Sequence, residues 1–153
     1  MSSDEKQTPE KSPRECALIA AAAADAKKAT DIMVQEVGVL VSVADYFVIA
    51  TAANNRQVEA IIDEVEKAER EQADIKPLHR EGLESGTWAL LDYGSFLVHV
   101  FQPEARDYYR LETLWNDAPI IDLKEAGITD AQYSDRIAKL LSREPAEKTE
   151  SGK

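Results

Sequence analysis

Asp45-Tyr46-Phe47-Val48-Ile49-Ala50-Thr51 is the stretch that decides the fold. It is aromatic and β-branched, and its apolar and polar residues do not alternate strictly. That pattern is typical of a strand covered on both faces, because neither set of alternate side chains meets water. The stretch therefore predicts a strand packed between other elements, which indicates an α/β protein.

A helix is predicted before this strand. Ser12-Pro13-Arg14-Glu15 is typical of a helix start, with Ser12 as N-cap, Pro13 at the first helical position and Glu15 completing a capping box. The helix should continue through an alanine-rich stretch to about Ala29. Its narrow alanine surface favours close packing on a sheet.

A second helix is predicted after the strand, with Asn54 and Asn55 as candidate caps. Four apolar residues then recur at i, i+3, i+4 and i+7, which is the spacing of one buried helix face. These residues are Val58, Ile61, Ile62 and Val65. Acidic residues occupy the other sides and are interpreted as a solvated face; they are Glu59, Asp63, Glu66, Glu69 and Glu71.

Further strands are predicted at residues 31–37, 78–81, 87–93 and 96–102. Gly94-Ser95 separates the last two and indicates a tight hairpin turn. Because a hairpin requires antiparallel neighbours, the sequence predicts a mixed β-sheet flanked by helices.

Two more helices follow the predicted hairpin. Pro103 can open a helix that takes in Arg106, Tyr109, Leu111 and Leu114. Another is expected at residues 130–141, with Thr129 and Gln132 forming a second capping box. Residues 1–11 and 143–153 are polar and are interpreted as disordered tails.

Composition limits the class of protein. The chain has 153 residues, 44% of them hydrophobic, and a net charge of −11, which fits one acidic globular domain. That charge argues against nonspecific binding to nucleic acid and favours encounter with a basic protein surface. Cys16, the only cysteine, is interpreted as a small core residue. With no signal-peptide pattern and no apolar run of about 20 residues, we expect a cytoplasmic protein without a membrane span.

Catalytic motifs are absent from the sequence. No phosphate-binding loop, dinucleotide motif or Gly-x-Ser-x-Gly elbow occurs. Gly94-Ser95 could begin a nucleotidyltransferase motif, but Phe96–Val100 lacks the two carboxylates that would hold metal ions. We therefore expect no catalytic residue, no metal ion and no cofactor.

Asp92 and His99 are the one constellation that supports an alternative, an enzyme acting on a nucleotide or phosphorylated substrate. On adjacent predicted strands they could form an acid/base pair or two metal ligands. The competing interpretation is a polar pair that packs against a partner. Trp88, just after the loop bracketed by Gly82 and Gly86, can likewise be an interface residue or an ordinary half-buried aromatic.

Taken in order, several blocks resemble one family, the ribosomal silencing factors, also called the Iojap family. The first is residues 45–51 with Asn55-Arg56-Gln57-Val58. The middle blocks are Glu81-Gly82, Gly86-x-Trp88, Leu91-Asp92-Tyr93-Gly94 and Val98-His99-Val100-Phe101. The closing block is Arg106-x-Tyr108-Tyr109-x-Leu111-Glu112-x-Leu114-Trp115.

The resemblance implies a concrete function. Members of the family bind ribosomal protein uL14 on the large ribosomal subunit, block joining of the small subunit and repress translation, and they are often homodimers when free. It also implies a nucleotidyltransferase-like fold without the catalytic carboxylates. The partner-binding residues it implies are Glu81, Gly82, Trp88, Asp92, Tyr93, His99 and Phe101, with Arg106, Tyr109 and Glu112 as weaker candidates.

The resemblance also divides the chain. It predicts a ribosomal silencing factor domain at residues 12–123, followed by a C-terminal extension at 124–142 that contains the last helix. The extension could cap the domain, contribute to dimerisation or contact the ribosome. No direct sequence-specific binding of nucleic acid is expected.

Overall fold

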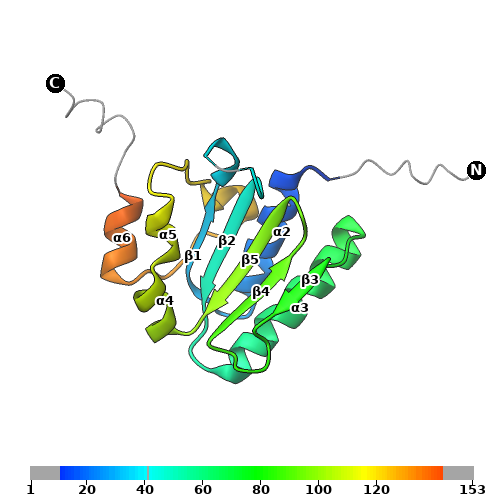
Figure 1. The fold of residues 1–153 in the computed structure, drawn as a ribbon, viewed down its shortest axis with the longest axis horizontal. Coiled ribbons are helices and arrows are strands. Elements are labelled where there is room, and N and C mark those ends of the chain that lie inside the picture. Colours follow the sequence, from blue (N-terminus) through cyan, green and yellow to red (C-terminus); the bar gives the residue numbers. More distant parts are fainter. Residues whose placement is uncertain (1–10, 41, 143–153) are drawn as a thin grey trace, which may run out of the picture.

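One mixed sheet of five strands forms the centre of the computed structural model, which describes residues 11–40 and 42–142 (Figure 1). In sheet order the strands are β1 (Thr30–Gln35), β2 (Tyr46–Thr51), β5 (Phe96–Phe101), β4 (Trp88–Asp92) and β3 (His79–Glu81). β2 and β5 run parallel, and the other neighbouring pairs run antiparallel. The predicted mixed sheet is confirmed, as is the hairpin at Gly94-Ser95. Apart from Lys11, the two predicted tails lie outside the described residues.

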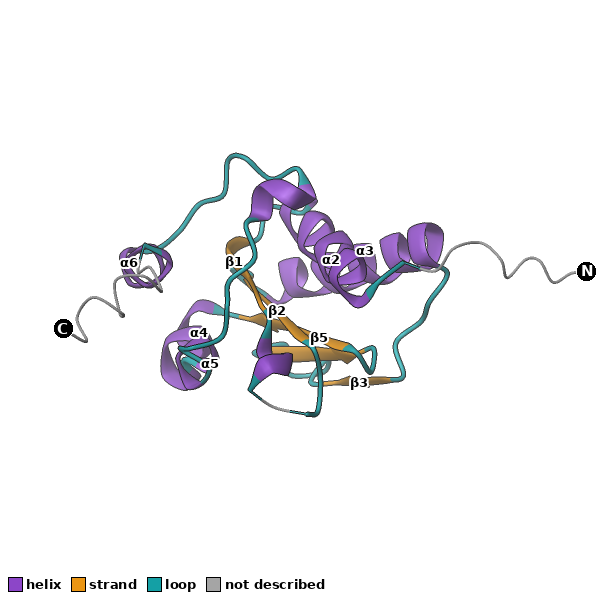
Figure 2. Ribbon diagram, turned by 90° about the horizontal axis from the view of Figure 1, so that it is seen from above, coloured by secondary structure: helices purple, strands orange, loops and turns teal. Residues whose placement is uncertain are grey.

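β2 is buried along its whole length, as its sequence predicts. It lies between β1 and β5, and helices cover both faces of this part of the sheet (Figure 2). α2 (Pro13–Ala26) and α3 (Asn55–Ala73) lie on one side, and α4 (Pro103–Tyr109) and α5 (Leu111–Leu114) lie on the other. The second pair lies toward β1 and β2, and no helix of the described residues covers β3 on that side.

α2 begins as predicted and packs through alanine. Ser12 Oγ accepts a hydrogen bond from Glu15 N, and Glu15 Oε1 accepts one from Ser12 N, which completes the capping box. Four alanines on one face have no exposed surface: Ala17, Ala20, Ala21 and Ala24. Their small side chains allow the helix to approach the sheet closely. Cys16 is buried beside them, which confirms its interpretation as a core residue.

α3 follows its predicted cap and apolar stripe, but one acid does not follow the prediction. Asn54 Oδ1 accepts a hydrogen bond from Gln57 N, and all four predicted stripe residues are buried. Glu69, predicted on the solvated face, is fully buried instead, and neither carboxylate oxygen has a partner among the described residues. This burial raises the pKa of Glu69 to about 8. The carboxyl group is therefore largely protonated near neutral pH.

The helix predicted from Pro103 is two helices in the structure. Arg110 has φ 45°, ψ 49°, a left-handed conformation that ends α4 before α5 begins. The break folds the chain back so that Glu112 reaches Arg106, and the Nε–Oε1 distance of this buried pair is 2.9 Å. The prediction of one continuous helix is wrong because this ion pair, and not the apolar periodicity, fixes the backbone.

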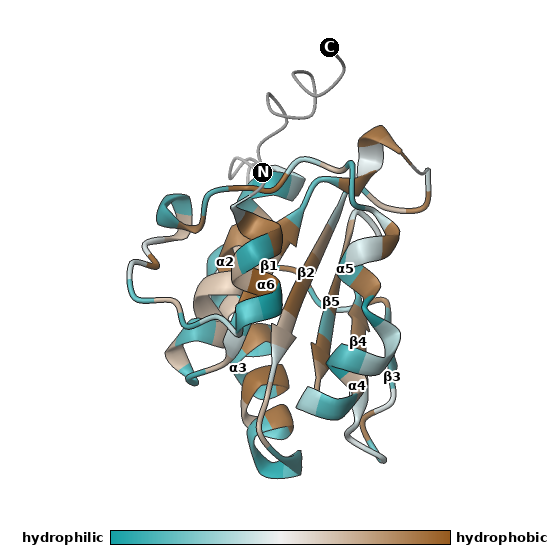
Figure 3. Ribbon diagram, turned by 90° about the vertical axis from the view of Figure 1, so that its left-hand side faces the viewer, coloured by the Kyte–Doolittle hydropathy of each residue, from teal (hydrophilic) through white to brown (hydrophobic). Residues whose placement is uncertain are grey.

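The prediction of a helix over residues 130–141 is also wrong at its start. α6 spans only Asp135–Leu141, and its N-cap is Ser134. Thr129 and Gln132 form no capping box, because the chain before Ser134 is bound to the edge of β1. Gln132 O accepts a hydrogen bond from Asp31 N at 2.9 Å. In Figure 3, α6 lies between α2 and the α4–α5 pair, over the β1 end of the sheet.

The free edge of β1 is covered by the chain that leads toward α6. Ile121 N donates a hydrogen bond to Val34 O, and Glu36 N donates one to Pro119 O. The short 3-10 helix η2 (Leu123–Ala126) follows this segment. Such cover removes unpaired backbone groups that would otherwise favour edge-to-edge association. None of the described helices is long and apolar enough to cross a membrane.

Candidate functional site

The candidate site lies on the sheet face opposite α2 and α3, where β4 and β5 extend past the cover of α4 and α5. In the antiparallel register, Trp88 lies opposite Phe101, Leu90 opposite His99, and Asp92 opposite Leu97. Directly paired residues of a sheet point to the same side. These six side chains therefore share one face, and we call it the open face.

Trp88 is the centre of an aromatic group on the open face. Its indole is half-buried, and its ring centroid lies 4.7 Å from that of Phe101 and 4.6 Å from that of Tyr109 on α4. Tyr108 packs edge-on against Tyr109 at 4.9 Å and is 80% exposed. We call Trp88, Tyr108 and Tyr109 the aromatic ledge. It presents large apolar area with polar groups at its rim, as interface hot spots do.

His99 holds the indole in place. Trp88 Nε1 donates a hydrogen bond of 3.1 Å to His99 Nδ1, so in neutral His99 the ring proton is on Nε2. His99 is 5% exposed, and burial together with the positive charge of Arg106 lowers its pKa to about 3. The ring is therefore neutral at physiological pH. Because Nδ1 is occupied and the ring is closed off from solvent, His99 is suited to positioning Trp88 and not to proton transfer.

Asp92 and His99 do not form the acid/base pair that the sequence left open. Asp92 is opposite Leu97, two ladder positions from the Leu90–His99 pair, and its Oδ1 accepts a hydrogen bond of 2.8 Å from Gly94 N. The carboxylate thus stabilises the β4–β5 turn. In the described part of the chain, no group of three His, Cys, Asp or Glu side chains is arranged to hold a metal ion.

The other candidates divide between the open face and the interior. Glu81 lies on β3 opposite Leu90, and its Oε2 is 2.9 Å from His79 Nε2. Gly82 has φ +74°, and a Cβ there would lie 2.0 Å from Trp88 O, so the backbone that carries the indole requires glycine. Phe101 is fully buried beneath Trp88.

Tyr93 is separate from this group. It lies on the α2–α3 side of the sheet, where its ring stacks on Phe96 with centroids 4.7 Å apart. Arg106 and Glu112, two of the weaker candidates, are buried as an ion pair. The structure therefore brings together Glu81, Gly82, Trp88, Asp92, His99 and Phe101, and it does not bring Tyr93 to the same surface.

Tyr108 is the surface residue that the sequence-based candidates omit. The signal that could have found it is the pair Tyr108-Tyr109 near the end of a helix opened by Pro103. Two consecutive tyrosines on a helix cannot both lie on a single buried stripe. One at least must face outward, and here both are exposed.

A shallow surface depression lies at the carboxyl ends of β2 and β5, lined by Asn54, Asn55, Arg56 and Gln102. Ligands of α/β proteins often bind at such strand ends. Here Gln102 Nε2 donates hydrogen bonds to Asn55 Oδ1 and Gly86 O, so its amide is engaged in joining the loops. The lining contains no acid or histidine that could take part in proton transfer.

Comparisons with known proteins agree on one family. A family model described as "Ribosomal silencing factor during starvation" matches residues 9–150. The chain is 43% identical over 105 residues to "Ribosomal silencing factor RsfS" of Bacillus subtilis, covering 69% of this chain and 88% of that protein. It is 37% identical over 113 residues to "Protein Iojap, chloroplastic" of Zea mays, covering 70% of this chain and 46% of that protein.

Solved structures show the same relationship. A crystal structure of a protein from Chromobacterium violaceum matches with a TM-score of 0.66 at 36% identity, over 69% of this chain and 87% of that chain. One from Bacillus halodurans matches with a TM-score of 0.59 at 36% identity, over 68% and 93%. At 36% identity the similarity is one of sequence as well as of fold.

Proposed function

The chain belongs to the ribosomal silencing factor family, and from that premise we propose that it silences ribosomes by docking its open face on ribosomal protein uL14 of the large subunit. The bound protein would occupy the surface that the small subunit must meet, and translation would fall for steric reasons. The observation that supports this most directly is the aromatic ledge, because it exposes Tyr108 and Tyr109 beside a half-buried indole without a covering helix.

Charge supports the same proposal. The chain carries a net charge of −11, and Glu81 and Asp92 are acids on the open face. A basic ribosomal protein is complementary to such a surface, and complementary charge speeds encounter and suppresses wrong partners. Association would therefore combine an apolar contact around Trp88 with electrostatic attraction around it.

Binding, and not catalysis, is the mode of action that we propose. Asp92 is engaged by the β4–β5 turn and His99 by Trp88, so the two side chains that could have served an enzyme have structural partners. We propose that the protein works without cofactor or metal ion, in the cytoplasm with the ribosomes. We also propose that it is a homodimer when free, which sedimentation equilibrium would test directly.

The decisive experiment measures binding of purified uL14 to the wild-type protein and to Trp88→Ala. Loss of a hot-spot aromatic should weaken binding by about 2–4 kcal/mol, at least about thirtyfold. Glu59→Ala, on an exposed position of α3 behind the sheet, is the matched control and should bind normally. On sucrose gradients, wild-type protein should sediment with free large subunits and lower the fraction of joined ribosomes, and Trp88→Ala should do neither.

Two outcomes would contradict the proposal. Wild-type protein that fails to bind uL14 would exclude this partner. A Trp88→Ala variant that folds normally and keeps wild-type affinity would show that the open face is not the docking surface.

A further inference from the structure

The helices that carry half of the aromatic ledge are too short to be stable alone. α4 has seven residues and α5 has four, whereas isolated helices shorter than about 12–15 residues are marginal in water. Tyr108 and Tyr109 end α4 immediately before the left-handed Arg110. The position of the ledge therefore depends on whatever ties α4 and α5 to the rest of the domain.

A buried ion pair provides the first tie. Arg106 on α4 donates through Nε to Glu112 Oε1 at 2.9 Å and through Nη1 to Thr51 Oγ1 at 2.8 Å. This joins α4 and α5 to each other and to the end of β2. Arg106 and Glu112 are 2% and 0% exposed. A buried carboxylate in such a pair strongly destabilises the fold if it loses its partners.

Arg136 on α6 completes this network from the other side. Its Nη1 donates to Glu112 Oε2 at 2.5 Å, so each oxygen of that carboxylate accepts from a different arginine. Its Nη2 lies 3.2 Å from Asp107 Oδ1 and 3.4 Å from Arg106 O, both on α4. One side chain of the C-terminal helix thus contacts both short helices, next to the residues that form the ledge.

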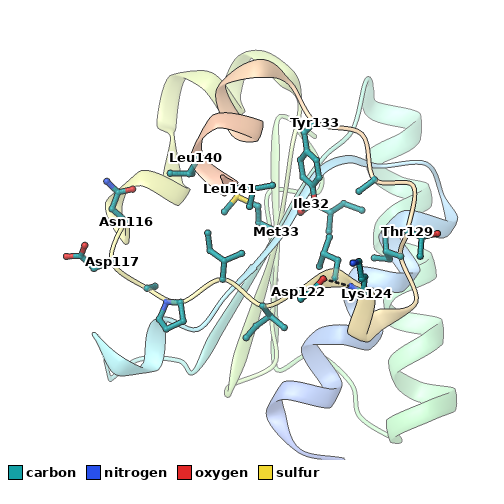
Figure 4. Close-up of a pocket in the computed structure, with 17 residues that line it drawn as sticks. Ile32, Met33, Asn116, Asp117, Asp122, Lys124, Thr129, Tyr133, Leu140 and Leu141 are labelled. Atoms are coloured by element: carbon teal, nitrogen blue, oxygen red, sulfur yellow. Dashed lines mark hydrogen bonds between the residues drawn. The ribbon is translucent and has the colours of Figure 1, made fainter. Parts of the chain in front are cut away.

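The residues just before α6 are hydrogen-bonded to β1, so the helix that carries Arg136 is itself attached to the sheet. Asp31 Oδ1 accepts a hydrogen bond of 2.7 Å from Ser134 N, and Tyr133 Oη donates one of 2.9 Å to Ile32 O. Tyr133 lies next to Ile32 along a groove of about 750 Å³ that Leu140 and Leu141 of α6 also line (Figure 4). Ile137 is fully buried. The segment from Tyr133 to Arg136 therefore bridges β1 and the α4–α5 pair.

We propose that Arg136 is a positioning residue of the docking surface: through Glu112 and Asp107 it holds α4 where Tyr109 packs on Trp88. This inference rests on the proposed function. It assigns to the C-terminal helix α6 the role of fixing the position of the aromatic ledge without being part of it. Arg136 need not touch the partner to change its affinity.

Arg136→Met tests this, with Lys139→Met as the control, since Lys139 is exposed on the same helix and differs by the same loss of charge. Amide hydrogen exchange should rise in residues 103–114 of Arg136→Met and stay unchanged in α2 and α3. Affinity for uL14 should fall by about two- to thirtyfold, the range seen for residues that modulate a site without contacting its ligand. Lys139→Met should change neither quantity.

A double-mutant cycle with Glu112→Gln separates positioning from general destabilisation. If Arg136 acts through Glu112, the loss of affinity in Arg136→Met/Glu112→Gln is smaller than the sum of the two single losses. Arg136→Lys keeps the charge but cannot reach both carboxylates as a planar fork does, so it should give an intermediate loss. Should Arg136→Met fail to fold, Arg136→Lys and Asp107→Asn provide the same comparison with milder changes.

The outcomes that would overturn the inference differ from those that would overturn the function. The positioning role would be refuted if residues 103–114 of Arg136→Met exchanged their amide hydrogens at the wild-type rate. Additive losses of affinity in the double-mutant cycle would also refute it, and neither result would contradict uL14 binding itself. Wild-type protein that does not bind uL14 would refute the proposed function, and the exchange experiment would still decide whether Arg136 holds α4.

Discussion

Trp88 Nε1 donates a 3.1 Å hydrogen bond to His99 Nδ1, which joins a half-exposed indole to a buried imidazole on the neighbouring strand. The bond runs diagonally between residues two ladder positions apart, since Trp88 is opposite Phe101 and His99 is opposite Leu90. It limits the rotamers that the indole can adopt. A side chain ordered before binding loses less entropy when the complex forms.

The first prediction removes this bond from either end. Trp88→Phe keeps an aromatic ring against Phe101 and Tyr109 but has no donor, and His99→Phe keeps an aromatic ring, larger than imidazole, but has no acceptor. Each should weaken uL14 binding by about two- to tenfold, the equivalent of one net hydrogen bond of about 0.5–1.5 kcal/mol. The double variant should lose little more affinity than either single variant, because both substitutions remove the same hydrogen bond. Additive losses, measured by titration calorimetry, would show that the bond does not position the indole.

The second prediction concerns Glu69 and pH. Its folded-state pKa, raised to about 8, lies above the ordinary value of 4.5, so between these values the folded state holds a proton that the unfolded state releases. Stability from this group is therefore full below about pH 4.5 and is lost as pH rises toward 8. Relative to Glu69→Gln, the wild type should lose up to about 1.4 kcal/mol of unfolding free energy per pH unit in this window.

Urea denaturation at pH 5.5, 6.5 and 7.5 measures the difference between Glu69→Gln and the wild type. The free energy of unfolding of Glu69→Gln should increase relative to that of the wild type as pH rises. Glu71→Gln, exposed on the same helix, is the control and should show no such trend. A pH-independent difference for Glu69→Gln would mean that the carboxyl group titrates normally in the fold.

The third prediction uses two glycines with similar backbone angles. Gly82 has φ +74° and Gly127 has φ +81°, so an alanine at either position is strained by about 1–2 kcal/mol. A Cβ at Gly127 meets nothing within 4 Å, whereas at Gly82 it would lie 2.0 Å from Trp88 O. Gly82→Ala should therefore lower the melting temperature more than Gly127→Ala and should alone weaken uL14 binding. Equal effects of the two substitutions on binding would indicate that the 82–88 loop does not position Trp88.

Parts of this molecule that depend on local pattern could be predicted from the sequence. β2, the alanine face of α2 and the stripe of α3 follow from periodicity, because each element buries the face that its own residues define. Alternation along β4 and into the residue that follows it also places Asp92 and Tyr93 on opposite faces. For that reason Tyr93, a candidate through family resemblance, lies away from Trp88 in the structure.

Features that depend on contacts between distant residues could not be predicted in this way. The break at Arg110 follows from the Arg106–Glu112 pair and its partner Arg136, which comes from another helix. The start of α6 depends on Asp31, about a hundred positions earlier, which binds Ser134 N. Burial of Glu69 likewise follows from how α3 lies on the sheet. The aromatic ledge depends on the first of these placements, since Tyr109 at the end of α4 packs on Trp88.

The last prediction follows from the charge of the chain. A net charge of −11 facing a basic ribosomal protein should steer encounter, and such steering raises association rates by about 10- to 1,000-fold at low salt. Exposed charges are screened beyond a Debye length of about 10 Å at 0.1 M salt, so the association rate should fall steeply as salt rises. The dissociation rate should change less, because it depends on short-range contacts around Trp88 and Tyr109. Stopped-flow measurements from low to high salt should therefore show nearly all of the salt dependence in the association rate.

Glu81→Gln should reduce the salt dependence of the association rate slightly without altering the dissociation rate, because it removes one exposed acid from the open face. An association rate independent of salt would mean that the acidic surface only keeps the protein in solution, and that the aromatic ledge supplies recognition without electrostatic help.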